Sequence, residues 1–219
     1  MPILSFVNAK GGVGKSSSAV HLALLLESRW GSDRVVFCDA DAQESSSRWL
    51  ERRQSQPDYI VATDPDRVLD SLPKLAQQAP YVVVDAPAGL AETTRAILLR
   101  SDLAACPCQP TDLDSDATET TLHLIEQAQS VRGGKPHPLL FLNKAQRNTY
   151  SKQTALEWMR RSGFSHSKSA IHYRQVFSRL YGQGASVWDL SSKPARQAAA
   201  EFEVLFDEML EAIDAKAIT

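Results

Sequence analysis

Cysteine is scarce in this chain, and long apolar runs are missing. Three cysteines occur in 219 residues, at Cys38, Cys106 and Cys108, and none forms a paired C-x-x-C spacing. That number excludes a disulfide-stapled framework and predicts a reducing, cytoplasmic environment. No apolar stretch reaches the roughly 18 residues that a membrane-spanning helix needs, so we expect no membrane span.

Neither sign of charge dominates the whole chain, whose formal net charge is −2. Between Arg132 and Arg196, however, twelve lysines and arginines face only two acids, Glu157 and Asp189. A stretch of about +10 indicates a surface for polyanions such as nucleic acid. The alternative is that the same charges solvate separate helix faces, because a basic segment need not place its charges together.

Apolar runs of strand length alternate with helical patterns along the chain. Several runs are continuous, which is typical of parallel strands buried on both faces. The alternation predicts an α/β fold, a doubly wound, mostly parallel sheet with helices on both faces, in one domain spanning residues 1–219. The expected strands are Ile3–Val7, Val35–Cys38, Tyr59–Ala62, Tyr81–Val84, Leu103–Pro107 and Leu139–Leu142. The expected helices are Ser16–Ser28, Ser45–Gln54, Arg67–Gln77, Thr93–Leu99, Asp114–Ser130, Thr154–Arg161 and Pro194–Ile213.

A glycine-rich loop lies between the first expected strand and the first expected helix, where residues 10–17 read KGGVGKSS. Glycines let backbone N–H groups converge on phosphates, and a helix N-terminus adds its positive dipole end. Lys15 should reach the β- and γ-phosphates, and the Ser16 hydroxyl should bind Mg²⁺. The loop residues expected to hold the nucleotide are Lys10, Gly11, Gly12, Val13, Gly14, Lys15, Ser16 and Ser17.

Three aspartates, Asp39, Asp41 and Asp85, stand at or just past the carboxyl ends of expected strands. A single aspartate in that position is more commonly a turn or cap residue. Three of them at the ligand-binding edge of an open sheet, together with a phosphate loop, favour a metal site instead. We expect Asp85 to hold Mg²⁺ through its water shell and Asp39 to support that shell.

The loop KGGVGKSS resembles the deviant Walker A motif of the ParA/MinD ATPases, in which an extra lysine precedes the glycine pair. Residues 35–43, VVFCDADAQ, resemble the family's strand and first switch, and residues 81–89, YVVVDAPAG, resemble its Walker B strand and second switch. The segment LLFLNK, residues 139–144, is similar to the strand whose terminal asparagine recognises adenine. Residues 170–187 resemble the short ParF-like plasmid partition ATPases.

The resemblance implies a P-loop NTPase of the deviant Walker type with ATP and Mg²⁺ as cofactors. It gives catalytic roles to Lys15, to Asp41, which would position the attacking water, and to Lys10. Lys10 would reach across a face-to-face, ATP-dependent homodimer to the partner's nucleotide. Asn143 would contact adenine. Ala42 replaces the family's usual proline and Ser16-Ser17 its usual threonine pair, but the required groups are kept.

The resemblance also implies a positioning motor whose ATP-bound dimers coat nucleoid DNA without sequence preference. A ParB-like adaptor on the cargo would stimulate hydrolysis and release. The cargo expected first is a plasmid, and the alternative is a protein cargo such as carboxysomes. The basic residues expected to contact DNA are Arg174, Arg179, Lys193 and Arg196, and the protein would be cytoplasmic and nucleoid-associated.

Two other functions within the same superfamily fit less well. A MinD-like membrane regulator needs a basic amphipathic C-terminal helix, but residues 201–219 hold six acids against the single Lys216, so we expect no membrane partner. An electron- or metal-transfer ATPase needs cysteines that share a cluster between subunits. Cys106 and Cys108 are the only candidates, and we expect them to be packing residues.

Overall fold

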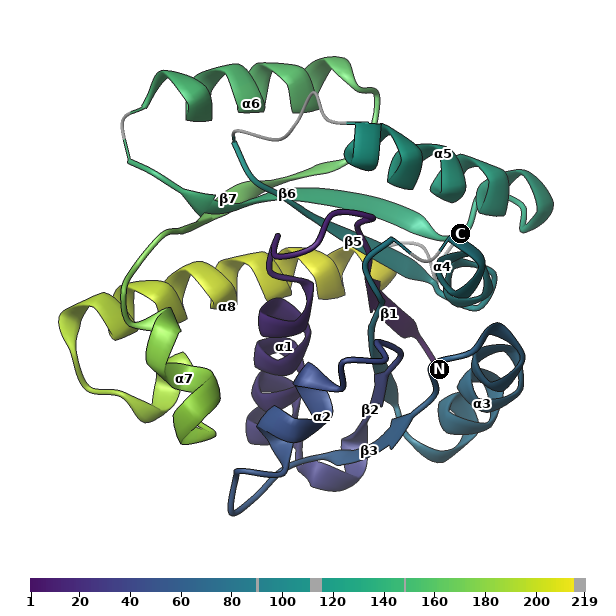
Figure 1. Cartoon of the computed structure of the whole chain (residues 1–219), viewed down its shortest axis with the longest axis horizontal. Helices are drawn as coiled ribbons and strands as arrows, with labels where there is room; N and C mark the ends of the chain where they lie inside the picture. Colours follow the sequence, from purple (N-terminus) through teal and green to yellow (C-terminus); the bar gives the residue numbers. More distant parts are fainter. Residues whose placement is uncertain (90, 111–115, 148, 215–219) are drawn as a thin grey trace.

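The computed structural model describes residues 1–89, 91–110, 116–147 and 149–214. Strands and helices alternate along this part of the chain, as expected (Figure 1). The strands are β1 (Ile3–Phe6), β2 (Val35–Asp39), β3 (Asp58–Val61), β4 (Tyr81–Asp85), β5 (Leu103–Cys108), β6 (His137–Ala145) and β7 (His166–His172). The helices are α1 (Lys15–Trp30), α2 (Ser45–Leu50), α3 (Pro65–Gln78), α4 (Ala91–Leu98), α5 (Asp116–Val131), α6 (Tyr150–Arg161), α7 (Phe177–Gln183) and α8 (Lys193–Asp214), with short 3-10 turns at Ser32–Arg34 and Val187–Asp189.

The strands form one seven-stranded sheet in the order β3-β2-β4-β1-β5-β6-β7. Every described pairing is parallel, so the predicted α/β fold is confirmed. The sequence predicted a mostly parallel sheet, and all of the described strand pairs are parallel. The chain runs from β1 through α1 toward β3, and then returns through α3 and α4 toward β7. In such a sheet, ligands bind outside the carboxyl ends of the strands where the direction of winding reverses.

Two helical layers cover the sheet (Figure 1). Apolar side chains of α3, α4, α5 and α6 pack on one face, around residues such as Leu72, Ile97 and Ile125. Side chains of α1, α2, α7 and α8 pack on the other face, around Leu22 and Phe202. Strands buried by both layers explain the continuous apolar runs in the sequence.

The second layer contains an aromatic cage around His21 of α1. The imidazole is fully buried, stacks on Phe202 with ring centroids 4.5 Å apart, and lies edge-on to Trp49 at 5.6 Å. Its Nδ1 lies 2.6 Å from the Ser17 carbonyl oxygen, and its Nε2 accepts a hydrogen bond from the Val187 N–H at 3.3 Å. Burial lowers the pKa of His21 to about 4, so the ring is neutral at physiological pH.

Two described elements, β7 and α7, were not expected from the sequence. Strand β7 reads HSKSAIH and lacks an apolar run, because it is an edge strand of the sheet. Helix α7 has seven residues and buries only Leu180 completely, too few to give a helical period. Residues 114–115, where one expected helix begins, lie outside the described part of the chain. None of the described helices is both long and apolar enough to cross a bilayer.

Candidate nucleotide site

The phosphate loop leaves β1 and enters α1 through two glycines with positive φ, Gly12 at +74° and Gly14 at +101°. Such angles are costly for residues with a Cβ. Gly14 is the N-cap of α1, and it has no side chain with which to cap the helix. The N–H groups of the first turn therefore remain available to a ligand, at the positive end of the helix dipole.

Asn143, near the carboxyl end of β6, is hydrogen-bonded to the backbone of this loop. Its Nδ2 donates to the Val13 carbonyl oxygen at 2.7 Å, and its Oδ1 accepts from the Lys144 N–H at 2.9 Å. Lys144 Nζ donates to the Gly12 carbonyl oxygen at 2.5 Å. The amide of Asn143 is thus engaged with the backbone of the loop, a role that sequence reasoning missed. Its expected contact with adenine stays a prediction.

Lys15 begins α1 and lies across the loop, where its Nζ donates to the Lys10 carbonyl oxygen at 3.1 Å. Burial lowers the pKa of Lys15, while the charges of Asp85 and Asp41 oppose that shift. Lys10 itself is positioned by its N–H, which donates to Asn8 Oδ1 at 2.9 Å. The loop therefore brings a partly desolvated ammonium group toward the two acids.

Asp39 and Asp85 are register partners on the adjacent strands β2 and β4, and both are fully buried. Helix α2 supplies a hydrogen-bond donor to each of them. Ser46 Oγ donates to Asp85 Oδ2 at 2.5 Å, and Ser47 donates to Asp39 Oδ2 through its N–H at 2.8 Å and its Oγ at 2.9 Å. Sequence reasoning missed both serines, although the Ser45–Ser47 run that opens a helix just after the acidic motif was a usable signal.

The pKa values of the two carboxyl groups are both raised above those of ordinary surface acids. Burial raises the pKa of Asp85 to about 7, against the lowering effects of the Ser46 and Ser16 hydroxyls and of Lys15. Burial also raises the pKa of Asp39, against the hydrogen bonds from Ser47 and Asp41. Both shifts arise from desolvation of negative charge, which a bound cation would relieve.

The residues present fit a magnesium ion that is mostly coordinated by water. Among the described residues, Asp85 Oδ1 is buried without a hydrogen-bond partner. No group of three or more His, Cys, Asp or Glu side chains forms a direct metal cage in the described ranges. A serine hydroxyl, a pair of buried carboxylates and space for waters match the preference of Mg²⁺ for a few protein oxygens plus water and phosphate.

Asp41 is the second residue after the end of β2, and it lines the same cavity as the phosphate loop. Its N–H donates to Asp39 Oδ1 at 3.1 Å, and its Oδ1 accepts from the Gln43 N–H at 2.9 Å. The half-buried carboxylate is therefore held in a tight turn with its remaining oxygen free to act on a ligand. This placement is compatible with the expected water-positioning role, which stays a prediction.

The phosphate loop, Lys15, Ser16 and Asp41 line one cavity of about 670 Å³, and the Asp39–Asp85 pair is buried beside it. Its wall begins at the phosphate loop and Asp41, passes Asn143 and Lys144, and continues along residues 172–178, which precede and open α7. Trp49, Tyr181 and Phe202 complete an aromatic side of the cavity. A cavity with a phosphate cradle at one end and aromatic and amide groups beyond it can accommodate a nucleotide.

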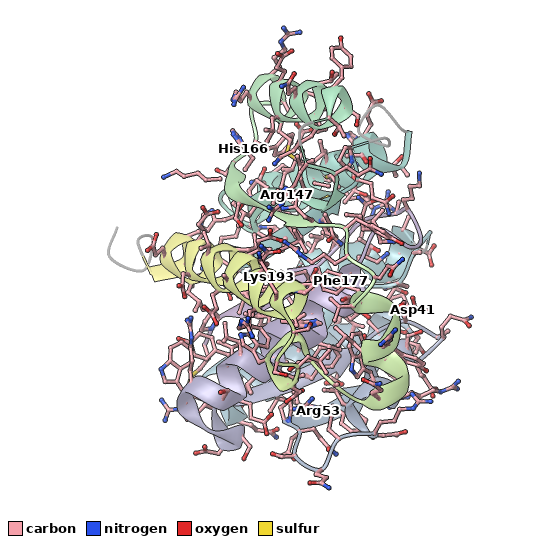
Figure 2. The ribbon with its side chains drawn as sticks, turned by 90° about the vertical axis from the view of Figure 1, so that its left-hand side faces the viewer. Asp41, Arg53, Arg147, His166, Phe177 and Lys193 are labelled. Atoms are coloured by element: carbon pink, nitrogen blue, oxygen red, sulfur yellow. The ribbon has the colours of Figure 1, made fainter. Side chains whose placement is uncertain are left out.

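The four basic residues expected to contact DNA differ in their exposure. Arg174 forms a bidentate pair with Glu201, with both N–O distances 2.6 Å, and its side chain is 8% exposed. The guanidinium of Arg174 is thus engaged with Glu201 in the cavity wall, and its expected contact with DNA stays a prediction. Arg179, Lys193 and Arg196 are exposed. Figure 2 shows Lys193 at the start of α8, on the same side of the molecule as Arg147.

An all-parallel sheet with a Gly-rich strand-to-helix loop, a buried lysine and two acids on neighbouring strand ends defines a P-loop nucleotide-binding protein. Residues 4–194 match the CobQ/CobB/MinD/ParA nucleotide binding domain, and the chain belongs to this family. The resemblance to the ParA/MinD ATPases is thereby confirmed.

Curated relatives match almost the whole chain. Maintenance of carboxysome distribution protein A from Gloeobacter kilaueensis is 28% identical over 209 residues, covering 94% of this chain and 93% of that protein. Protein ParA from Rhizobium radiobacter is 25% identical over 210 residues, covering 91% of each.

Solved structures share the fold at lower identity. The ATP complex of a McdA variant from Cyanothece superposes with a TM-score of 0.78 at 15% identity, covering 96% of both chains. Cobyrinic acid a,c-diamide synthase from Mycobacterium smegmatis, with an ATP analogue and magnesium, gives a TM-score of 0.75 at 18% identity, covering 96% of this chain and 94% of that one. The expected cofactors, ATP and Mg²⁺, are therefore confirmed as ligands of solved proteins with this fold.

Proposed function

We propose that this protein is a Mg²⁺-dependent ATPase of the ParA type that forms an ATP-dependent homodimer and positions a cargo on DNA. The observation that carries the proposal is that Lys15 and Asp41 line the cavity beside the phosphate loop, next to a buried pair of acids. Asp39 accepts from the Asp41 N–H, and Asp85, its register partner, acts through its charge on Lys15. Cations and backbone N–H groups aimed at phosphate, with acids that can hold a metal, suit phosphoryl transfer, in which positioning and charge stabilisation do most of the catalysis.

Each residue has a separable task in this proposal. The N–H groups of Gly11–Ser17 cradle the phosphates, and Lys15 neutralises charge on the β- and γ-phosphates. Mg²⁺, held by Ser16 and through water by Asp85 and Asp39, supplies further neutralisation of that charge. Asp41 holds the attacking water in line with the γ-phosphate, and Lys10 extends toward the nucleotide of a second copy. Loss of the γ-phosphate removes the group that both subunits hold, so hydrolysis separates the dimer.

DNA would bind to the exposed basic residues at the start of α8 and on α7. Lys193 and Arg196 are exposed there, and Arg147 faces a shallow pocket shared with Pro194 and Gln197. Phosphate contacts from such side chains supply affinity without sequence preference. A ParB-like adaptor on the cargo would accelerate hydrolysis, and the protein would be found on the nucleoid in the cytoplasm.

The cargo separates two versions of the proposal. The resemblance of residues 170–187 to short plasmid partition ATPases favours a plasmid, whereas the carboxysome-distribution relatives, at 28% and 29% identity, support a protein cargo. Deletion of the gene in its own host distinguishes them. Plasmid loss during growth identifies the first cargo, and clustering of protein bodies with stable plasmids identifies the second.

The experiment that tests the core of the proposal measures binding to non-specific duplex DNA with ADP or ATP and Mg²⁺, across a salt series, together with the mass in solution. We expect an ATP-dependent dimer whose DNA affinity falls steeply with salt. The Lys15→Ala variant should remain monomeric with ATP. A monomer with ATP in the unaltered protein would contradict the dimer switch, and a dimer that ignores DNA would reduce the basic surface to a solvated one.

A further inference from the structure

Helix α2 and the residues just after it contact both the metal acids and the C-terminal part of the chain. Ser46 and Ser47 donate to Asp85 and Asp39. Trp49 of α2, and Arg53 three residues beyond the end of α2, contact residues 184–189, which we call the α7–α8 link. The same short helix therefore touches the acids of the nucleotide site and the connection to α8.

Three hydrogen bonds fix this second contact. Trp49 Nε1 donates to the Ala185 carbonyl oxygen at 3.1 Å. Arg53 donates to the Gly184 carbonyl oxygen at 2.9 Å and to Asp189 Oδ2 at 2.7 Å. The Trp49 side chain is buried and the Arg53 side chain is only 17% exposed, so the bonds to the Ala185 and Gly184 carbonyl oxygens are partly shielded from competing water. The Asp189 side chain is 42% exposed, so its bond to Arg53 is open to water.

The α7–α8 link lies directly against the backbone at the end of α2. A Cβ at Gly184, where φ is +60°, would lie 2.6 Å from the Arg52 carbonyl oxygen. The Arg52 guanidinium lies 4.5 Å from the centre of the Tyr181 ring on α7. Asp189 is further held by the N–H and hydroxyl of Ser186. The link is thus a packed, hydrogen-bonded unit rather than a loose connection.

We propose that Trp49 and Arg53 are positioning residues that hold α2 in the register at which Ser46 and Ser47 orient the acids for Mg²⁺. The inference rests on the proposed Mg²⁺ role of Asp39 and Asp85. Groups that orient metal-binding carboxylates tune metal affinity even when they do not touch the ion. Here the orienting serines are themselves held in place by the contacts of Trp49 in the same helix and of Arg53 just beyond its end.

The arrangement gives the α7–α8 link a regulatory consequence. The link leads into α8, whose first turn carries Lys193 and Arg196, and its Val187 N–H also bonds to His21 on the phosphate-loop helix. A partner that shifts the link would therefore alter the register of α2 and the affinity for Mg²⁺. By linkage, binding of Mg²⁺ and nucleotide would alter affinity for that partner by the same factor.

The test compares Arg53→Gln with Arg48→Gln in the full-length chain. Arg48 lies on α2, is exposed, and pairs with Glu44 at 3.5 Å, with no recorded contact to the link among the described residues. The probe is a non-hydrolysable ATP analogue, and the readout is the Mg²⁺ concentration that gives half of its thermal stabilisation. We expect Arg53→Gln to raise that concentration about threefold or more, and Arg48→Gln to leave it unchanged.

Two further measurements separate positioning from a general loss of stability. Trp49→Phe keeps an aromatic ring but removes the Nε1 donor, and it should raise the same Mg²⁺ concentration. Binding of the analogue in EDTA should be equal in all variants, and ATPase activity should recover at high Mg²⁺. If Arg53→Gln and Trp49→Phe each lowered the unfolding midpoint but left the Mg²⁺ requirement unchanged, the inference would be overturned. If the unaltered protein binds the analogue independently of Mg²⁺, the proposed metal role of Asp39 and Asp85 fails first, and the inference falls with it.

Discussion

The amide nitrogen of Asn143 occupies the space in which a side chain at Gly14 would begin. A Cβ built on Gly14 lies 2.0 Å from Asn143 Nδ2, far inside any permitted contact, and that nitrogen is bonded to the Val13 carbonyl oxygen. Glycine is therefore required at this position for two reasons: the backbone φ is positive, and the Asn143 side chain on β6 leaves no room for a Cβ.

Gly14→Ala should lose nucleotide binding and destabilise the fold more than positive φ alone explains. The matched control is Gly133→Ala, where φ is +62° and nothing lies within 4 Å of the added Cβ. We expect the control to cost about 1–2 kcal/mol of unfolding free energy from backbone strain, and Gly14→Ala to cost clearly more. Urea unfolding and nucleotide binding measure both. Equal costs with intact binding would show that Asn143 moves aside freely.

Asp41→Ala should retain ATP binding and dimer formation but hydrolyse ATP about 100-fold more slowly, the scale expected when a group that positions or deprotonates the nucleophile is removed. Single-turnover phosphate release and the mass with ATP check the two parts. Asp58→Ala, an exposed aspartate at the start of β3, is the control and should hydrolyse normally. Unchanged hydrolysis by Asp41→Ala would assign the water to another residue.

Replacing Lys193 and Arg196 together by glutamate should weaken binding to any duplex sequence. If each residue neutralises one phosphate, the slope of log affinity against log salt should become shallower by about 2. The control pair is Arg160→Glu with Arg161→Glu, two exposed cations on α6. A salt series with fluorescently labelled DNA measures all variants. An equal loss from both pairs would indicate a net-charge effect rather than a localised surface.

His21 should make the fold less stable in mild acid. Its folded-state pKa of about 4 lies below the ordinary histidine value of 6.5, so the unfolded chain takes up the proton first as pH falls. The contribution is fully present above pH 6.5, declines between pH 6.5 and 4, and amounts at most to about 3 kcal/mol. Asp85, with its raised pKa, acts in the opposite direction, so variants must be compared at each pH.

The measurement is the difference in unfolding free energy between pH 7.5 and pH 5 for the unaltered protein and for His21→Phe. Phenylalanine keeps the aromatic stacking on Phe202 but cannot titrate. We expect His21→Phe to lose less stability on acidification, whatever its stability at pH 7.5. A parallel decline in both proteins would mean that the imidazole is protonated in the folded state as readily as in the unfolded chain.

Much of the site was predictable because its chemistry depends on residue type at fixed spacing. The lysine and glycines of the phosphate loop and the aspartates at strand ends can be read directly from the order of the residues. Burial on both faces marked six strands as apolar runs, so the order of elements was predictable as well. The roles of the individual site residues remain predictions until the variants are measured.

The residues that sequence reasoning missed act through partners that are distant in the chain. Ser46 and Ser47 matter because α2 places them on Asp85 and Asp39. The serine run marks the start of a helix in the sequence, but it does not show which acid each serine reaches. Arg174 was assigned to a DNA surface from its charge alone, but charge does not reveal that Glu201 on α8 neutralises it. Asn143 likewise gains its clamp role only when β6 is brought beside the loop.

Strand β7, whose polar residues gave no strand signal in the sequence, also affects how molecules of this protein can associate. An open edge strand offers unpaired N–H and C=O groups to any other strand. Here α8 lies along β7, where Glu208 accepts from the Lys168 N–H and Glu201 from the His172 N–H. With these two donors occupied by carboxylates, strand addition at the β7 edge of the sheet is disfavoured. Assembly is thereby directed to surfaces other than this edge, including the loops at the carboxyl ends of the strands.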